Sequence, residues 1–350
     1  MPKIRVLVVE DSVTFRRCLC EALGSDPAIE IVGEAGDGKT AIEICQALRP
    51  DVVTLDMMLP VMSGLAATEY IMAHCPTPIL IISSSTNRGE LFKTYDALAA
   101  GAVDAMEKPV RGESDEWAQI ISAVKLTSRI KVITHLRARL ASAVHHAPAT
   151  RIADHGGCRV VGIGASTGGP SAVVSVLKAI PLGLPQPILL VLHIGETLGK
   201  ALADWLDGQT QYRVSYARDG EVAADAGGRV VMAPPDRHLE VRGGRLRLTS
   251  AGPRFSCRPS VDVLFESIAR EYASAAAGCL LTGMGNDGAA GLLEIRRAGG
   301  LTLAQDEATS VVYGMPREAA MIGAAELVLP LGEIGPTLGS FMALHSQQED

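Results

Sequence analysis

The sequence predicts an α/β protein made of two doubly wound, mostly parallel domains. Short runs rich in Val, Ile and Leu alternate with segments whose apolar residues recur every three or four positions, as strands and helices do around a parallel sheet. This alternation occurs in two series, with a basic, helix-breaking stretch between them. A chain of 350 residues is also long for a single hydrophobic core.

The first series predicts a domain over residues 1–124. Helical spacing recurs between its strands, as in "VTFRRCLCEAL" and "TAIEICQAL", and a long helical stretch near "WAQIISAVKL" closes the series. The expected strands, in chain order, are "IRVLVVE", "AIEIVGEA", "DVVTLD", "PILIISS" and "AVDAME".

Residues 125–157 are predicted to form a basic linker between the two domains. From Lys125 to Arg151 the chain has six basic residues and no acidic one, and "HHAPATRIADHGG" then breaks any helix. We expect a segment that is helical at first and irregular afterwards. Its charge indicates a solvated face or a docking surface rather than a nucleic-acid arm.

The second series predicts a mainly parallel α/β domain over residues 158–345. Alternating runs in "HLEVRGGRLRLTS" flank Gly243 and Gly244, which predicts an antiparallel β-hairpin as an addition to this domain. The expected parallel strands are "RVVGIGAS", "PILLVLHI", "RVVMAPP", "GCLLTGMG" and "GLTLAQD".

Composition excludes several classes of protein. A hydrophobic content of 47% with 20% charged residues is typical of a globular chain, and a formal net charge of −7 argues against nucleic acid as the main partner. The seven cysteines form no C-x-x-C pair and no secretory leader precedes Lys3, so we expect reduced thiols in a cytoplasmic protein. No apolar run reaches the roughly 18 residues that span a bilayer, so no membrane insertion is expected.

Polar residues follow four strands of the first domain. Glu10 and Asp11 end the first strand and Asp56 ends the third, and three carboxylates at the carboxyl edge of a parallel sheet favour a hard divalent cation. Ser83 and Lys108 end the fourth and fifth strands, where a hydroxyl and an ammonium suit an incoming phosphoryl group with Asp56 as nucleophile. Each residue alone could be an ordinary strand-end polar group. The joint pattern favours a phosphoryl-transfer site.

With these residues, positions 3–124 resemble the flavodoxin-like receiver domain of bacterial response regulators. The resemblance implies that Asp56 is phosphorylated, that Ser83 and Lys108 contact the phosphoryl group, and that the Lys108–Pro109 peptide bond is cis. It also implies a Mg²⁺ site made by Glu10, Asp11, Asp56 and the backbone carbonyl of Met58. One departure is Ala105, which stands where receivers commonly carry an aromatic residue that takes part in switching.

A glycine-rich loop, "GIGASTGGP", follows the first strand of the second domain. A dinucleotide-binding loop needs glycine where Thr167 stands, and a phosphate-binding P-loop needs lysine where Pro170 stands. The remaining match is the G-x-S-x-G elbow that exposes a nucleophilic serine, here Ser166. On its own this pattern is equally well explained by a chance turn of small residues.

A serine nucleophile needs a base and a group that orients it. His193 directly follows the strand in "PILLVLHI", and His238 in "APPDRHLEV" is the competing base. Asp287 in "LTGMGNDGAAG" precedes a helix, so it is a candidate acid or simply the N-cap of that helix. Backbone amides near Met284 could face a developing oxyanion. The chain order Ser, His, Asp differs from the order in α/β-hydrolases.

These residues together resemble the catalytic domain of bacterial chemotaxis protein-glutamate methylesterases, a Rossmann-like domain. The resemblance implies a triad of Ser166, His193 and Asp287, with the backbone amides of Thr167 and Met284 as oxyanion donors. The sequence "HIGETLG" departs from the family's usual sequence after the histidine, and this departure is expected to affect substrate fit. The resemblance is carried by "GIGASTGGP", "VLHI", "ARDGEV", "VVMAPPDRHLEV", "RPSVDVLFESIA", "LTGMGNDGAAGL" and "LAQDEATSVVYGMPREA".

The function expected from this resemblance is a phosphorylation-activated hydrolase. It would remove methyl groups from γ-glutamyl methyl esters of methyl-accepting chemotaxis receptors, releasing methanol, and deamidate receptor glutamines. A chemotaxis histidine kinase would supply the phosphoryl group, Mg²⁺ would serve the receiver, and the esterase would need no cofactor. One alternative is a response regulator with a DNA-binding or otherwise non-catalytic output domain, which would show a basic helix-turn-helix unit. A nucleotide-binding module is the other, and Thr167 and Pro170 weaken it.

Overall fold

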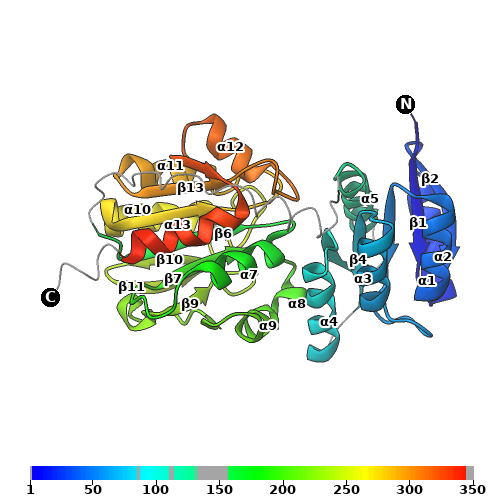
Figure 1. Ribbon diagram of the computed structural model, residues 1–350, viewed down its shortest axis with the longest axis horizontal. Helices are drawn as coiled ribbons and strands as arrows, with labels where there is room; N and C mark the ends of the chain where they lie inside the picture. Colours follow the sequence, from blue (N-terminus) through cyan, green and yellow to red (C-terminus); the bar gives the residue numbers. More distant parts are fainter. Residues whose placement is uncertain (1, 85–86, 110–113, 131, 133–156, 344–350) are drawn as a thin grey trace. The chain divides into compact units, whose positions relative to one another are not determined.

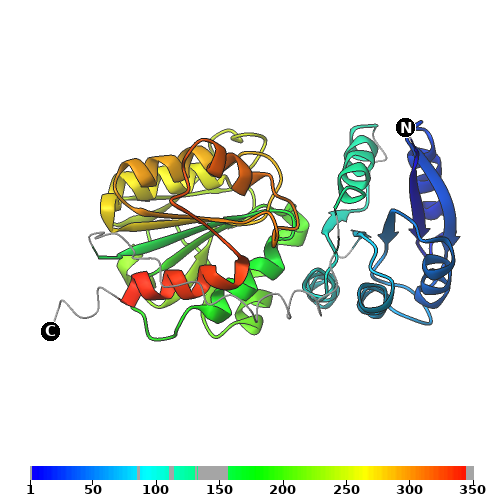
Figure 2. The same ribbon diagram turned by 45° about the horizontal axis from the view of Figure 1, so that its top comes forward.

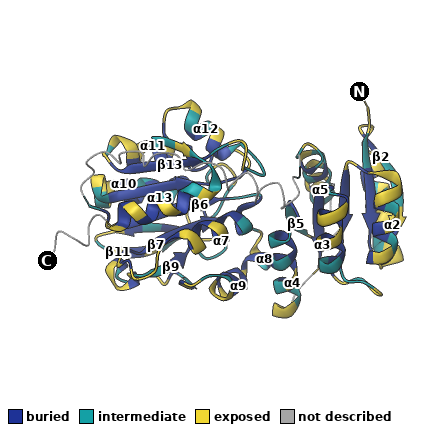
Figure 3. Cartoon of the chain, in the orientation of Figure 1, coloured by how far each residue is buried: buried dark blue, intermediate teal, exposed yellow. Residues whose placement is uncertain are grey.

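The computed structural model describes residues 2–84, 87–109, 114–130, 132 and 157–343. The chain divides into two compact units, Met1–Val144 and His145–Asp350, and each has its own hydrophobic core. In both units the central strands are buried, and most exposed residues lie on the outer sides of helices and in loops (Figure 3).

The limits predicted for the two domains and the linker stay predictions, since most of residues 125–157 fall outside the described residues. The last helix of the first unit continues to Thr127, so the predicted linker begins inside it. Lys125 on this helix forms an ion pair with Asp26, which ties the helix to the first unit.

The first unit is a five-stranded parallel sheet in the order β2-β1-β3-β4-β5, the flavodoxin-like order that the resemblance implies (Figure 1). Each predicted run contains one observed strand. The strands are β1 (Ile4–Val9), β2 (Ile29–Ala35), β3 (Val52–Leu55), β4 (Ile79–Ser83) and β5 (Asp104–Glu107). The helices are α1 (Val13–Gly24), α2 (Gly38–Leu48), α3 (Gly64–His74), α4 (Arg88–Ala99) and α5 (Ser114–Thr127).

Short polar side chains start the first four helices of this unit. Each accepts a hydrogen bond from the backbone amide three residues ahead, which satisfies one of the unpaired donors of a helix N-terminus. These N-caps fix where each loop turns back from the carboxyl edge of the sheet into a helix. They are Ser12, Asp37, Ser63 and Asn87.

The second unit is a seven-stranded parallel sheet in the order β14-β13-β12-β6-β7-β9-β8, with a separate hairpin of β10 and β11. The predicted hairpin is therefore confirmed. The strands are β6 (Val160–Ala165), β7 (Ile188–Leu192), β8 (Arg213–Tyr216), β9 (Arg229–Met232), β10 (His238–Arg242), β11 (Arg245–Thr249), β12 (Ala276–Leu280), β13 (Leu301–Gln305) and β14 (Leu327–Leu329). The sequence reading missed β8 and β14, which are short and only partly buried.

Helices cover both faces of this sheet, with α10 and α11 on one face and α7 and α13 on the other (Figure 2). None of the described helices is long and apolar enough to cross a bilayer. The helices are α7 (Gly169–Ala179), α8 (Glu196–Gly199), α9 (Leu202–Gln209), α10 (Val261–Tyr272), α11 (Ala289–Arg297), α12 (Met315–Met321) and α13 (Leu331–Ala343), with short 3₁₀ turns η1 (Ala223–Ala226) and η2 (Ala273–Ala275).

The central strand β6 is the switch point of the sheet, where the direction in which successive strands are added reverses. The chain runs from β6 to β7, β8 and β9 on one side, and later fills β12, β13 and β14 on the other. Ligands of open parallel sheets bind at the carboxyl ends of strands at such a switch point. Helix α10 lies close against β6, because a Cβ atom at Gly164 would come within 2.3 Å of Val261. The glycines of this strand therefore serve packing.

Candidate active site and phosphorylation site

Ser166 stands at the switch point, directly after β6. The chain turns sharply there, because the amide of Gly169 donates to the carbonyl of Ser166 at 2.7 Å and α7 begins at once. Gly168 makes this turn with φ of +76°, and a Cβ atom in its place would come within 2.6 Å of Val311. A strand-to-helix turn of this kind presents the partly exposed serine at the edge of the sheet.

The ends of the two neighbouring strands flank Ser166. On one side, β7 pairs Leu192 with Ala165, and the amide of His193 donates to the carbonyl of Ala165 at 3.0 Å. His193 is thus the residue beside Ser166. On the other side, the Ser166 amide donates to the carbonyl of Thr282 at 3.0 Å, and a Cβ atom at Gly283 would come within 2.8 Å of the Ser166 Cβ atom.

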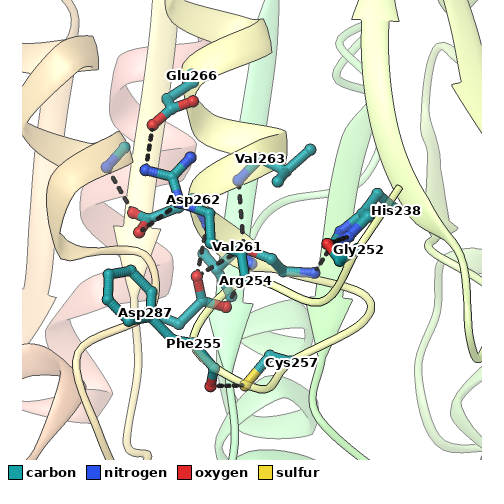
Figure 4. A network of polar contacts seen from close by, with 12 residues as sticks. His238, Gly252, Arg254, Phe255, Cys257, Val261, Asp262, Val263, Glu266 and Asp287 are labelled. Atoms are coloured by element: carbon teal, nitrogen blue, oxygen red, sulfur yellow. Dashed lines mark hydrogen bonds and ion pairs between the residues drawn. The ribbon is translucent and has the colours of Figure 1, made fainter. Parts of the chain in front are cut away.

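Asp287, the third predicted residue beside Ser166 and His193, lies in the loop after β12. It is buried, and its Oδ2 atom accepts a hydrogen bond from Nε2 of His193 at 2.8 Å. Its carboxylate is directed at the first turn of α10 (Figure 4), where it accepts from Ser260 Oγ at 2.7 Å, Val261 N at 2.7 Å and Asp262 N at 3.1 Å. Asp287 does not cap its own helix, since Gly288 holds that position in α11.

These contacts shift the pKa values of Asp287 and His193. Burial by itself would raise the pKa of Asp287, but hydrogen bonds from His193, Ser260 and the Val261 amide outweigh it and hold the pKa below its usual value. Burial by itself would lower the pKa of His193, but the carboxylate of Asp287 and the neighbouring Cys257 raise it to about 9. Because Asp287 occupies Nε2, the imidazole exchanges a proton with other groups through Nδ1.

His238, the competing base, has a structural position. It is fully buried, its Nδ1 atom accepts from the amide of Ser260 at 3.2 Å, and its Nε2 atom is 3.2 Å from the carbonyl of Gly252. Backbone groups therefore engage both ring nitrogens. His238 supports the chain between β11 and α10 rather than facing Ser166.

The two predicted oxyanion donors lie on the two loops that meet at Ser166. Thr167 follows the serine, and its carbonyl accepts from the hydroxyl of Thr282 at 3.0 Å, which ties the two loops together. Met284 follows Gly283 and is half exposed. Their backbone amides stay predictions as oxyanion donors.

The sequence reading missed the residues that hold Asp287 and the adjoining loop. Ser260 is the N-cap of α10 and binds Asp287 with the same hydroxyl. Arg254 forms an ion pair with Glu266 at 2.7 Å and lies 3.7 Å from Asp262 (Figure 4). Burial raises the pKa of Asp262 to about 6. A serine ahead of the apolar pattern "VDVLFESIA" signals a helix start, but nothing in that pattern signals a contact 27 residues away.

A second polar group lies at the carboxyl edge of the first sheet. Lys108 Nζ contacts Asp56 Oδ2 at 2.8 Å and Glu10 Oε2 at 2.7 Å, and both carboxylates are buried while Asp11 is exposed. Ligand oxygens of Glu10, Asp11 and Asp56 lie within 4.8 Å of one another. Ser83 is buried at the end of β4, and its carbonyl accepts from the Lys108 amide at 3.1 Å. The structure thus brings these predicted residues together.

Burial and Lys108 have opposite effects on the pKa of Glu10. Burial raises the pKa of Glu10, although the hydrogen bond from Lys108 opposes it. For Lys108, burial would lower the pKa, but hydrogen bonds to Asp56 and Glu10 outweigh it and raise the pKa. Met57 and Met58 donate their amides to Asp56 Oδ1 at 2.7 and 3.4 Å.

The remaining expectations for this unit have mixed outcomes. Ala105 lies in β5, opposite Ile81 of β4, at the position expected for the aromatic residue. Among the described residues the one cis peptide bond precedes Pro259, so the expectation of a cis bond before Pro109 is wrong. The backbone carbonyl of Met58 stays a prediction as a metal ligand.

Comparisons with known proteins match both halves of the chain. Residues 161–338 match the family described as CheB methylesterase, and residues 6–120 match the response regulator receiver domain. A protein-glutamate methylesterase/protein-glutamine glutaminase of Anaeromyxobacter dehalogenans is 43% identical over 334 residues, 95% of either chain. One of Caulobacter vibrioides is 43% identical over 344 residues, 97% of this chain and 98% of the relative.

A solved structure is similar to the second unit. The CheB methylesterase catalytic domain of Thermotoga maritima is 34% identical and matches with a TM-score of 0.50, covering 54% of this chain and all of that domain. This likeness agrees with the parallel α/β fold described above.

Proposed function

The chain belongs to the CheB methylesterase family, and from this premise we propose that it hydrolyses γ-glutamyl methyl esters of chemoreceptors under control of its receiver domain. The observation that carries the proposal is the hydrogen bond between His193 and Asp287 beside Ser166, at the switch point of the sheet. A nucleophile, a base and an orienting carboxylate at adjacent strand ends are the parts that acyl transfer needs.

In the first half of the reaction, Ser166 Oγ attacks the carbonyl carbon of the ester and His193 Nδ1 takes the serine proton. Asp287 keeps the ring proton on Nε2 and stabilises the imidazolium, so Nδ1 is the nitrogen that acts as the base. The amides of Thr167 and Met284 stabilise the negative oxygen of the tetrahedral intermediate. His193 then returns the proton to the methoxide oxygen, and methanol leaves.

In the second half, water attacks the acyl-serine ester. His193 accepts a proton from the water and passes it to Ser166 Oγ, which restores the serine and releases the glutamate side chain. A glutamine side chain reacts by the same steps, with ammonia in place of methanol. None of these steps requires a metal or an organic cofactor.

The receiver supplies the control. Asp56 accepts a phosphoryl group from a chemotaxis histidine kinase, and Ser83 and Lys108 contact that group. Receiver domains bind Mg²⁺ for this reaction, and the clustered oxygens of Glu10, Asp11 and Asp56 fit a hard cation. These residues, with the carbonyl of Met58, would hold the ion, and the bound ion would supply positive charge beside the phosphoryl group.

We further propose that the unphosphorylated receiver restrains the esterase and that phosphorylation relieves the restraint. The reaction takes place in the cytoplasm, where receptor helices and the kinase are available, and involves no nucleic acid. A DNA-binding output domain is not favoured, since the second unit is a seven-stranded α/β domain of the CheB methylesterase family.

The test is methanol release from methylated chemoreceptor membranes, with and without a small-molecule phosphodonor. The wild-type protein should release methanol, and the phosphodonor should raise the rate. Ser166→Ala should release none while Asp56 is phosphorylated normally, because only the nucleophilic hydroxyl is lost. Methanol release by Ser166→Ala at the wild-type rate would exclude the serine mechanism.

A further inference from the structure

Cys257 lies beside the candidate base in a contact that ester hydrolysis does not use. Its Sγ atom is 3.7 Å from Nδ1 of His193, while Nε2 of the same ring is bonded to Asp287 at 2.8 Å. Potential metal-ligand atoms of the three side chains lie within 4.8 Å of one another. A thiolate and an imidazole are the ligands that zinc prefers in proteins.

We propose that His193 Nδ1 and Cys257 Sγ together bind Zn²⁺ and that the bound ion inhibits the esterase; the inhibitory effect rests on the proposed function. In tetrahedral zinc sites Zn–N is about 2.05 Å and Zn–S about 2.3 Å, which separates the two ligand atoms by about 3.6 Å. The 3.7 Å between these two atoms matches that separation. Both ligands therefore reach one ion without movement of the backbone.

Asp287 gives the histidine the environment of a zinc ligand. Zinc-bound histidines almost always donate their second ring N–H to a carboxylate or carbonyl, which fixes the tautomer and makes the free nitrogen a better ligand. Here the second nitrogen of His193 is bonded to Asp287, and the first faces Cys257. Asp287 therefore orients the ring and is not itself a ligand.

A tight turn holds the thiol in place. Arg254 and Cys257 exchange two backbone hydrogen bonds, of 3.0 and 2.8 Å, around Phe255 and Ser256. Both central residues have positive φ, 49° and 63°, as a type I′ turn requires and as residues other than glycine avoid. The Cys257 Sγ atom also contacts the carbonyl of Phe255 at 3.4 Å (Figure 4). Such a backbone persists only where its surroundings hold it.

Ion pairs fix the backbone at both ends of this turn. Arg254 is bound by Glu266 of α10 at 2.7 Å, and Arg258 donates Nε–H to Asp236 at 2.7 Å and a second N–H to the carbonyl of Ala251 at 3.1 Å. The position of the thiol relative to His193 is thus set before any metal binds. A preorganised pair loses little conformational freedom on binding.

The chemistry of the bound ion leads directly to inhibition. On binding, the Cys257 thiol and the protonated His193 ring each give a proton to solvent, and the ion takes the lone pair of His193 Nδ1, which then cannot accept the proton of Ser166. Resident zinc sites have three or four protein ligands, whereas this site has two and leaves two positions for water. The bound ion therefore exchanges with solvent. The receiver acids offer only oxygen and favour Mg²⁺ instead.

The first test titrates ZnCl₂ into the full-length protein without phosphodonor and measures methanol release against each variant's own metal-free rate. Zinc should inhibit the wild type, and a chelator should restore the rate. For Cys257→Ala, half-inhibition should need at least about tenfold more zinc. Cys18→Ala is the matched control, since Cys18 is an exposed thiol of the other unit, and it should behave as wild type. No inhibition of the wild type, or equal inhibition of Cys257→Ala, overturns the proposal.

The second test measures binding without activity. Co²⁺ added to Ser166→Ala should produce thiolate-to-cobalt charge-transfer absorption, and Zn²⁺ should remove it by displacement. The absorption should be absent when Cys257→Ala or His193→Ala is combined with Ser166→Ala, and present when Cys18→Ala is combined with it. Thermal melting shows that each variant folds. If Cys257→Ala does not fold, Cys257→Ser replaces it. Cobalt absorption by Ser166→Ala together with no methanol release by the wild-type chain would refute the esterase and leave the metal site standing. No cysteine-dependent absorption refutes the site.

Discussion

The two polar sites of this protein lie at the same kind of place, the carboxyl edge of a parallel sheet, but they balance negative charge differently. In the receiver, three carboxylates gather around Lys108, which contacts two of them. In the catalytic unit, the single carboxylate of Asp287 accepts four hydrogen bonds, from His193, Ser260 and the first two amides of α10.

Only the site with unbalanced negative charge is suited to switching. In the receiver site, three carboxylates and one lysine leave a net negative charge. A divalent cation, or a change of charge at Asp56, alters this charge strongly. The charge of Asp287 is stabilised by donors fixed in the start of a helix, and these donors need no added ion. We therefore expect the receiver to respond to Mg²⁺ and phosphorylation, and the charge of Asp287 to depend on neither.

The largest effect expected is the loss of the base. His193→Ala should lower kcat for methanol release by roughly 10⁶-fold, because the serine keeps its proton. His238→Ala is the matched control: it should lower the melting temperature, since a buried hydrogen-bonded ring is lost, but keep kcat within a few-fold. If His238→Ala were inactive and His193→Ala active, the base would be assigned to the wrong histidine.

A smaller loss is expected when the orienting charge is removed. Asp287→Asn should lower kcat by about 10⁴-fold, less than loss of the base or nucleophile. The carboxylate raises the pKa of His193 by favouring its charged form, so its removal lowers that pKa. Only neutral His193 accepts a proton, so the acid limb of the kcat/KM profile should move to lower pH. A limb that stays in place would show that Asp287 does not set the charge of His193.

The fold and the positions of Ser166 and His193 at strand ends could be predicted because each is signalled locally. Strands such as β6 and β7 are continuous apolar runs, and Ser166 and His193 each follow one directly. The support of Asp287 could not be predicted, since it comes from the start of α10, a segment far along the chain. Cys257 gave no signal, because its place beside His193 depends on a turn of two residues with positive φ.

At the receiver, Asp56→Asn should leave the basal rate unchanged and remove all stimulation by a phosphodonor. The amide cannot form the acyl phosphate, while its size preserves the packing around Lys108. Methanol release is measured before and after addition of the phosphodonor. Stimulation that survives in this variant would place phosphorylation at another residue.

The smallest effect is expected from Ala105→Tyr. Ala105 lies in β5, at the position where receivers commonly carry an aromatic residue. A tyrosine there should change the ratio of stimulated to basal rate more than the basal rate itself, because it acts on the balance between two receiver conformations. Equal changes in both rates would indicate an effect on the esterase rather than on switching.

The difference between the two sites is tested most directly by a chelator. A fragment beginning at residue 151 is compared with the full-length protein, each with and without EDTA, and the full-length protein also with a phosphodonor. We predict that the fragment releases methanol faster than the unphosphorylated full chain, that EDTA leaves the fragment's rate the same or higher, and that EDTA abolishes the phosphodonor response. A fragment that loses activity in EDTA would contradict the metal-free triad, and one no faster than the full chain would contradict restraint by the receiver.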